Sequence, residues 1–139
     1  MNQPKLESDF LKQKGPLQGV RVLELAHIMA GPVCGLMLAD LGADVIKVEK
    51  MPGGDDTRRM IPPKVGEESA AFMMMNRNKR GIAINLKQEQ GKEILRKLVA
   101  EADVLIENYR HDTMKKLGLG YDAVSYTHLR AHETDSYLV

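Results

Sequence analysis

The 139-residue sequence contains one cysteine, no tryptophan, almost no net charge and no long apolar run. Because Cys34 is the only cysteine, no internal disulfide can form, which favours a reducing compartment such as the cytoplasm. A formal net charge of +1 gives no overall basic field, which disfavours nucleic acid as a partner. No apolar stretch approaches the roughly 18 residues of a membrane-spanning helix, and residues 1–15 lack the apolar centre of a secretory signal. We therefore expect a cytoplasmic protein with no membrane or nucleic-acid partner.

A strand–helix–strand pattern occupies the stretch from Val20 to Lys50, VRVLELAHIMAGPVCGLMLADLGADVIKVEK. Apolar residues dominate 20–26 and 45–48, as in strands of a parallel sheet that is covered on both faces. Pro32 suits the first turn of the intervening helix. The loop after the first strand is therefore predicted at the carboxyl edge of a parallel sheet, where such sheets bind ligands.

A second unit of the same kind is predicted downstream. The predicted elements are strands at 81–86 and 103–107 and helices at 69–76, 89–102 and 112–117. Ser69 is a plausible N-cap, Gly42 and Gly118 suit helix ends, and Gly91 should weaken its helix by about 1 kcal/mol relative to alanine. The proline- and glycine-rich residues 51–68 predict a long surface loop. Strands that alternate with helices predict an α/β fold with a doubly wound parallel sheet.

The two ends of the chain differ from the part between them. Residues 1–16 are polar and have no periodic pattern, which predicts a flexible N-terminal arm. Residues 124–139, VSYTHLRAHETDSYLV, also lack sustained periodicity, and their first part resembles the translation of a sequencing-library adapter. We predict that 124–139 are a non-native, adapter-encoded tail, and that the natural protein departs from this sequence at about Ala123.

Four motifs carry a resemblance to a known family: HIMAGPVCGLMLADLGADVIKVEK, MMNRNKRGIAINLK, ADVLIENYR and LGLGYD. In this order and spacing, residues 17–122 resemble the class III coenzyme A transferases. This group, also called the CaiB/BaiF family, includes formyl-CoA transferase and acyl-CoA racemases. The resemblance implies that residues 17–123 are the N-terminal part of a large Rossmann-like domain, so that the parallel sheet is incomplete in this chain. It also implies an interlocked homodimer, an acyl-CoA and a carboxylic acid as substrates, and no permanently bound cofactor.

The implied reaction is the transfer of coenzyme A from an acyl-CoA donor to a carboxylic acid acceptor (EC 2.8.3.-). In the family an aspartate attacks the thioester and forms a mixed anhydride, and the released thiolate then forms an enzyme-bound thioester. That aspartate lies beyond the LGLGYD motif, and no aspartate of this chain matches its context, so we expect the catalytic residue to be missing and the chain alone to be inactive. Two alternatives stay open: an acyl-CoA racemase with acid and base groups at the α-carbon, or a noncatalytic nucleotide- or CoA-binding α/β fragment.

The resemblance also implies a set of coenzyme-binding residues, most of them at strand ends. They are Met29, Ala30, Lys50, Ile84, Asn85, Leu86, Lys87, Asn108, Tyr109, Arg110 and Lys116. Met29 stands near the reacting acyl group, where some members of the family have glutamine. Tyr109 could stack on a base, and Arg110 could meet a phosphate.

Each of these regions also has a purely structural interpretation. The loop at 27–31 could be a plain tight turn, Lys50 a solvated lysine, and the cations of NRNKR at 76–80 favourable charges at a helix end rather than contacts for phosphates. Cys34 is predicted to be a buried small apolar residue, and the methionines at 73–75 to pack in the core or in a dimer interface. No spacing of histidine, cysteine and carboxylate residues indicates a metal site.

Overall fold

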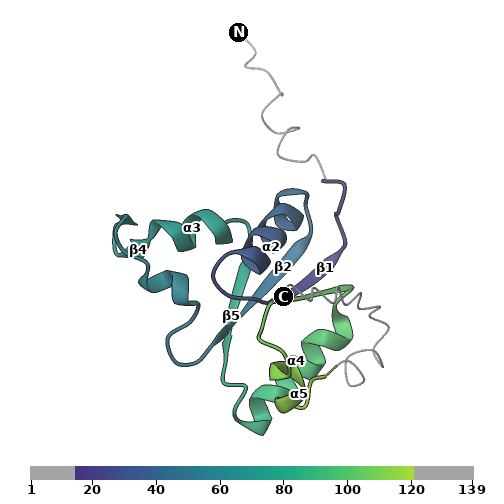
Figure 1. Cartoon of the computed structure of the whole chain (residues 1–139). Coiled ribbons are helices and arrows are strands. Elements are labelled where there is room, and N and C mark those ends of the chain that lie inside the picture. The colour runs from purple at the N-terminus through teal and green to yellow at the C-terminus, as the bar shows by residue number, and fades with distance from the viewer. Residues whose placement is uncertain (1–14, 121–139) are drawn as a thin grey trace, which may run out of the picture.

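A computed structural model describes residues 15–120 of the chain (Figure 1). The predicted tail at 124–139, the end of the LGLGYD motif and residues 1–14 of the predicted arm lie outside the described residues. Four parallel strands form the central sheet: β1 (Arg21–Leu25), β2 (Asp44–Lys50), β5 (Arg80–Ile84) and β6 (Val104–Glu107). Their order across the sheet is β5-β2-β1-β6, which is the order that the first four strands of doubly wound nucleotide-binding sheets have. The predicted α/β fold with a parallel sheet is therefore confirmed.

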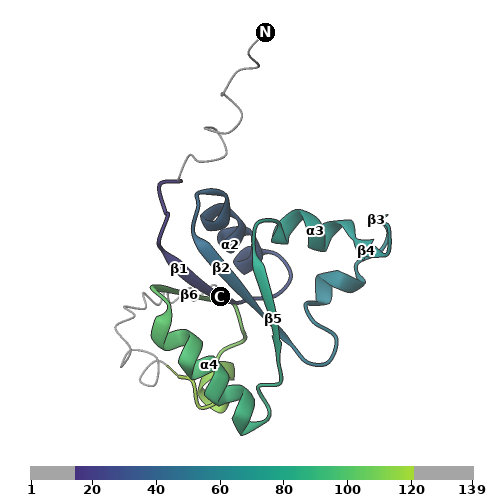
Figure 2. The ribbon, with the colours of Figure 1, turned by 180° about the vertical axis from the view of Figure 1, so that it is seen from behind.

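Helices cover the two faces of this sheet (Figures 1 and 2). The described helices are α2 (Ala30–Asp40), the 3₁₀ helix η1 (Asp56–Arg59), α3 (Ala70–Asn76), α4 (Glu89–Glu101) and α5 (Thr113–Lys116). All four strands run in the same direction, but their order across the sheet reverses at β1, because β2 and β5 lie on one side of β1 and β6 on the other. Open sheets of this kind bind ligands outside the carboxyl ends of the strands at such a reversal point.

Two apolar clusters lie on opposite faces of the sheet because side chains alternate along a strand. One cluster joins Leu23 and Leu25 of β1 to Leu95 and Val99 of α4. The other joins Val22 and Val45 to Ala39 of α2 and to Ala43 in the turn that follows this helix. Each of β1 and β2 therefore packs on both of its faces, as the continuous apolar pattern predicted.

Several local predictions are confirmed by the backbone. The Ser69 hydroxyl accepts a hydrogen bond from the Phe72 N–H and caps α3. Gly42 and Gly118, with φ of +98° and +70°, follow α2 and α5 at the positions where helices favour glycine. The predicted loop at 51–68 is wrong in part, because it contains η1 and the hairpin of β3 (Lys64–Val65) and β4 (Glu68–Ser69).

The burial of Cys34 was predicted wrongly. Helix α2 turns its small residues toward the sheet, and Cys34 and Met37 lie on the exposed side of the helix. In the methionine run of α3, Met75 is buried in the core, whereas Met73 and Met74 are exposed. Among the residues that the structure describes, no helix is long and apolar enough to cross a membrane.

Candidate functional site at the carboxyl edge of the sheet

The four strand ends bring the candidate binding residues to one edge of the sheet. Because β5, β2, β1 and β6 are parallel neighbours, the segments after Ile84, Lys50, Leu25 and Glu107 emerge side by side. These segments hold all the coenzyme-binding residues predicted above except Lys116, which ends α5. The predicted grouping at the edge therefore follows from the observed topology, and the role of each residue depends on its contacts.

Asn108 connects the loop after β6 to the loop after β1 by two hydrogen bonds. Its side-chain Oδ1 accepts a hydrogen bond from the His27 N–H, and its Nδ2 donates to the His27 carbonyl, both at 2.9 Å. The neighbouring Gly31 is required here, because a Cβ at this position would lie 2.2 Å from the Ala26 Cβ. The side-chain amide of Asn108, which was predicted to contact the coenzyme, therefore hydrogen-bonds to the backbone of His27.

Asp55 connects the loop after β2 to the turn at His27 and Ile28 by a hydrogen bond. Its Oδ1 accepts hydrogen bonds from the Ile28 N–H at 3.1 Å and from the N–H and hydroxyl of Thr57, each at 2.9 Å. Ile28 has a φ of +68°, a left-handed conformation that is an outlier for a β-branched residue. The consecutive peptide groups of His27 and Ile28 are thus held from two sides, by Asn108 and by Asp55.

Lys47 forms a buried ion pair with Asp55 on the face of the sheet that α2 covers. Its ammonium group lies 2.8 Å from Asp55 Oδ2, 2.9 Å from Glu24 Oε1 and 2.9 Å from the Ala26 carbonyl, and only 2% of its side chain is exposed. Burial by itself raises the pKa of Asp55, but hydrogen bonds from Lys47 and Thr57 and the charge of Lys47 outweigh it and lower the pKa to about 2. Asp55 is therefore ionised at every pH at which the protein is expected to work.

Lys79 completes this buried charge network. Its ammonium group lies 2.7 Å from Glu24 Oε2 and donates to the Pro32 carbonyl at 2.8 Å and to Asn76 Oδ1 at 3.0 Å. Burial lowers the pKa of Lys79, and the pairing with Glu24 opposes that effect. Two ammonium groups thus face two carboxylates, so the network is neutral, as buried charges require.

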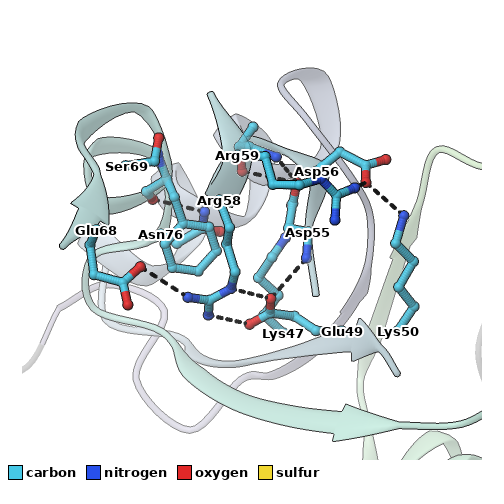
Figure 3. A network of polar contacts seen from close by, with 12 residues as sticks. Lys47, Glu49, Lys50, Asp55, Asp56, Arg58, Arg59, Glu68, Ser69 and Asn76 are labelled. Carbon is cyan, nitrogen blue, oxygen red and sulfur yellow. Dashed lines mark hydrogen bonds and ion pairs between the residues drawn. The ribbon is translucent and has the colours of Figure 1, made fainter. Parts of the chain in front are cut away.

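A second group of charges surrounds η1 (Figure 3). The Arg58 guanidinium makes two 2.7 Å contacts with the Glu49 carboxylate and lies over the Phe72 ring, 3.7 Å from its centroid. The hydrogen bonds from Arg58 hold the pKa of Glu49 below its usual range, although burial opposes them. Lys50, a predicted coenzyme contact, instead pairs with Asp56 at 2.7 Å and remains half exposed. These contacts join η1, within the predicted surface loop, to the end of β2 and to α3.

The side chain of His27, in the turn at His27 and Ile28, packs beside Tyr109, and the two ring centroids are 5.2 Å apart. Burial lowers the pKa of His27, and the charges of Lys50 and Lys47 lower it further against the opposing charge of Asp55. Burial, with the nearby carboxylates of Glu107 and Asp55, raises the pKa of Tyr109 to about 12. Both rings are therefore neutral at pH 7, and much of the Tyr109 ring is covered by this packing.

The remaining predicted residues divide into buried and exposed groups. The side chain of Ile84 is 4% exposed and lies in the core, so only its backbone remains for a ligand, and Leu86 packs against the same core cluster. The Asn85 Oδ1 accepts from the Lys87 N–H and shapes the turn. The side chains that stand out at or near the edge are those of Met29, Ala30, Lys87, Arg110 and Lys116.

The cations of NRNKR do not gather at this edge. Arg77 pairs with Asp40 of α2, Lys79 is buried against Glu24, and Arg80 makes a two-point contact with Asp44 at the amino end of β2. The structural interpretation of this segment is therefore the one that the contacts support. Within residues 15–120, no group of three or more His, Cys, Asp or Glu side chains is arranged to hold a metal ion.

Asp55, Lys47 and Ile28 were not predicted as site residues. The alternation of DVIKVEK indicates that Lys47 lies on the opposite face of β2 from Val48, but not that it is buried. The pair Gly53-Gly54 before Asp55, with φ of +95° and +64°, marks a tight turn that returns the chain toward β1. Apart from Thr57, the partners of Asp55 could not be found from sequence, because Ile28 and Lys47 lie on other elements.

The fold and the edge together define an α/β protein whose parallel sheet has a candidate ligand site at its reversal point. The model of CoA-transferase family III matches residues 17–130, and the chain belongs to this family. A CaiB/BaiF family protein from Brucella suis has a similar structure, with a TM-score of 0.77 and 49% identity over 83% of this chain and 31% of that one.

Curated relatives of the chain are CoA-transferases. It is 46% identical over 121 residues to a succinyl-CoA:glutarate CoA-transferase of Mus musculus, which covers 87% of this chain and 27% of that protein. It is 49% identical over 123 residues to a succinate–glutarate CoA-transferase of Agrobacterium fabrum, with 84% and 31% covered. A formyl-CoA:oxalate CoA-transferase of Escherichia coli is 40% identical over 109 residues, with 78% and 26% covered. The chain thus spans less than a third of the length of these relatives.

Proposed function

We propose that the whole protein transfers coenzyme A from an acyl-CoA donor to a carboxylic acid, and that the carboxyl edge of this sheet binds the coenzyme. The observation that carries the proposal is the turn at His27–Ile28, held from two sides at the reversal point of the sheet in a chain of this family. A rigid turn can present a thioester in a fixed position, which favours reaction.

The exposed side chains at the edge suit different parts of the coenzyme. The cations of Lys87, Arg110 and Lys116 suit its phosphates. Met29, 63% exposed at the start of α2, lies in the turn that faces the reacting acyl group in this proposal. Because methionine offers no amide, it makes an apolar contact there and donates no hydrogen bond.

The proposed chemistry uses an aspartate from another part of the whole protein. Its carboxylate attacks the thioester carbonyl, the carbon–sulfur bond breaks, and a mixed anhydride and the coenzyme thiolate form. The thiolate then attacks the aspartyl carbonyl of the anhydride, which releases the donor acid and leaves an aspartyl-CoA thioester. The same steps in reverse order, with the acceptor carboxylate, complete the transfer.

We further propose the interlocked homodimer that the family resemblance implies, and a cytoplasmic location, which suits the single cysteine.

The relatives indicate which substrates to test first. Their names pair succinyl-CoA with glutarate and formyl-CoA with oxalate, so we propose a dicarboxylic acid as acceptor. The whole natural protein is incubated with succinyl-CoA and a panel of dicarboxylic acids, and new acyl-CoA is detected by mass spectrometry. Formation of glutaryl-CoA or a similar thioester supports the proposal. Coenzyme binding without transfer, but with α-proton exchange in deuterium oxide, would support the racemase instead, and absence of coenzyme binding would contradict both.

A further inference from the structure

Ile28 adopts a backbone conformation that its own side chain disfavours. Its φ of +68° belongs to the left-handed region, where a β-branched residue is an outlier. Such a conformation persists only where the surroundings impose it, and it is often found at functional sites. The residue is 43% exposed, so packing of its side chain is not what fixes the backbone.

The backbone N–H of Ile28 makes a hydrogen bond to a buried carboxylate. The Ile28 N–H donates to Asp55 Oδ1, and the Asp55 side chain is fully buried. All its polar neighbours, the Ile28 N–H, the N–H and hydroxyl of Thr57 and the Lys47 ammonium, donate to it or pair with it. Since Lys47 also donates to the Ala26 carbonyl, the same ammonium group holds both Asp55 and the end of β1.

We propose that Asp55 is a positioning residue, which keeps Ile28 in the left-handed conformation and so sets where Met29 stands at the carboxyl edge. This inference rests on the proposed function, because Met29 is the residue proposed to face the acyl group. If Asp55 releases the Ile28 N–H, the turn relaxes toward negative φ and Met29 moves. A displacement of about 1 Å at a reacting group can lower a rate by about 10²-fold.

The test compares two substitutions of buried carboxylates in the whole protein, Asp55→Asn and Glu24→Gln. Asparagine at 55 has one acceptor oxygen in place of two, and the buried Lys47 ammonium is the strongest donor beside it. The oxygen should therefore stay with Lys47, and the NH₂ group should face the Ile28 N–H and break that contact. Glu24→Gln removes a charge from the same network without a direct contact to the turn. It is therefore the matched control for loss of stability. Amide exchange at Ile28, steady-state kinetics and the thermal midpoint are measured for both variants.

We expect Asp55→Asn to speed exchange of the Ile28 amide and to lower kcat by about 10- to 100-fold, with a much smaller change in the KM for acyl-CoA. Glu24→Gln should lower the thermal midpoint and leave both the exchange rate and kcat near those of the wild type. Equal loss of kcat in the two variants, or unchanged exchange at Ile28 in Asp55→Asn, would overturn the proposal.

A third substitution tests whether Asp55 acts through the backbone of Ile28. Glycine adopts positive φ without strain, so Ile28→Gly removes the need for a restraint. In that background, Asp55→Asn should lower kcat by a smaller factor than in the wild type, and equal factors would show that Asp55 acts by another route. If the wild-type protein binds no coenzyme and transfers none, the proposed function fails, while the exchange rates still decide whether Asp55 holds the turn.

Discussion

The side chain of Asn108 and the backbone of His27 exchange two hydrogen bonds of 2.9 Å. The two residues are 81 positions apart in the chain. They continue the contact between β1 and β6 beyond the last register pair, Leu25 with Glu107. An amide side chain thereby joins the two sides of the reversal point, where the proposed coenzyme edge lies.

Replacement of Asn108 by alanine should loosen this edge. Two hydrogen bonds of about 0.5–1.5 kcal/mol each predict a loss of about 1–3 kcal/mol in the free energy of unfolding, measured by urea titration of the whole protein. The affinity for coenzyme A should also fall, because His27 and the start of α2 lose their fixed position. Asn108→Asp is a useful comparison, since it keeps the contact to the His27 N–H and loses the one to the carbonyl. An intermediate loss is expected for it, and an alanine variant as stable as the wild type would contradict this role.

The low pKa of Asp55 predicts a pH dependence of stability. The folded-state pKa of about 2 lies below the ordinary aspartate value of 3.8, so the contribution is present above pH 4 and is lost as the pH falls from about 4 to 2. It amounts to about 2 kcal/mol. Because Asp40, Glu49 and Asp56 also have lowered pKa values, the test is the difference between wild type and Asp55→Asn in urea titrations from pH 5 to pH 2. Parallel curves for the two proteins would show that Asp55 is not linked to folding.

Lys47 should be the most sensitive lysine in the described part of the chain. It faces both Glu24 and Asp55 inside the protein, so Lys47→Met leaves two buried carboxylates with less compensation. Removal of one partner of a buried pair lowers the free energy of unfolding by about 3–5 kcal/mol. Lys97→Met, on the exposed side of α4, is the control and should change stability by less than about 0.5 kcal/mol. Similar unfolding midpoints for the two variants would contradict the buried network.

Arg110 offers a test of coenzyme binding that does not depend on catalysis. It is exposed after β6, so Arg110→Ala should leave the fold intact and raise the Kd for coenzyme A by about three- to tenfold. If Arg110 meets the 3′-phosphate, the effect should be smaller for 3′-dephospho-coenzyme A in the same titration calorimetry. Arg96→Ala, which removes a pair with Glu89 on α4, is the matched control. Equal Kd values in the Arg110 and Arg96 variants would remove Arg110 from the site.

Local signals in the sequence were enough to predict the main elements and the edge at which they meet. Ser69, Gly42 and Gly118 mark helix ends by chemistry that acts within a few residues, and parallel strands necessarily end at a common edge. The contacts that hold the edge together were not predictable. Asn108 with His27 and Asp55 with Ile28 are long-range pairs, and nothing in the residues beside them distinguishes a binding amide from a structural one.

Gly91 also shows how local signals can mislead. The expected effect of Gly91→Ala on stability changes sign once the contacts of Gly91 in the structure are known. From helix propensity alone, Gly91→Ala should stabilise α4 by about 1 kcal/mol. In the structure Gly91 is buried, and a Cβ there would lie 2.1 Å from the Asn85 carbonyl oxygen. Alanine must therefore displace the backbone after β5, so we expect a loss of about 1–3 kcal/mol in the free energy of unfolding.

The same displacement would reach the proposed coenzyme segment from Asn85 to Lys87, so Gly91→Ala should also weaken binding of coenzyme A. Gln90→Ala, one residue earlier on the exposed side of the same turn, raises helix propensity without touching Asn85. It should leave both stability and binding close to those of the wild type. Urea titration and calorimetry of the two variants decide between the interpretations, because a stabilised Gly91→Ala protein would show that helix propensity outweighs the close approach to Asn85.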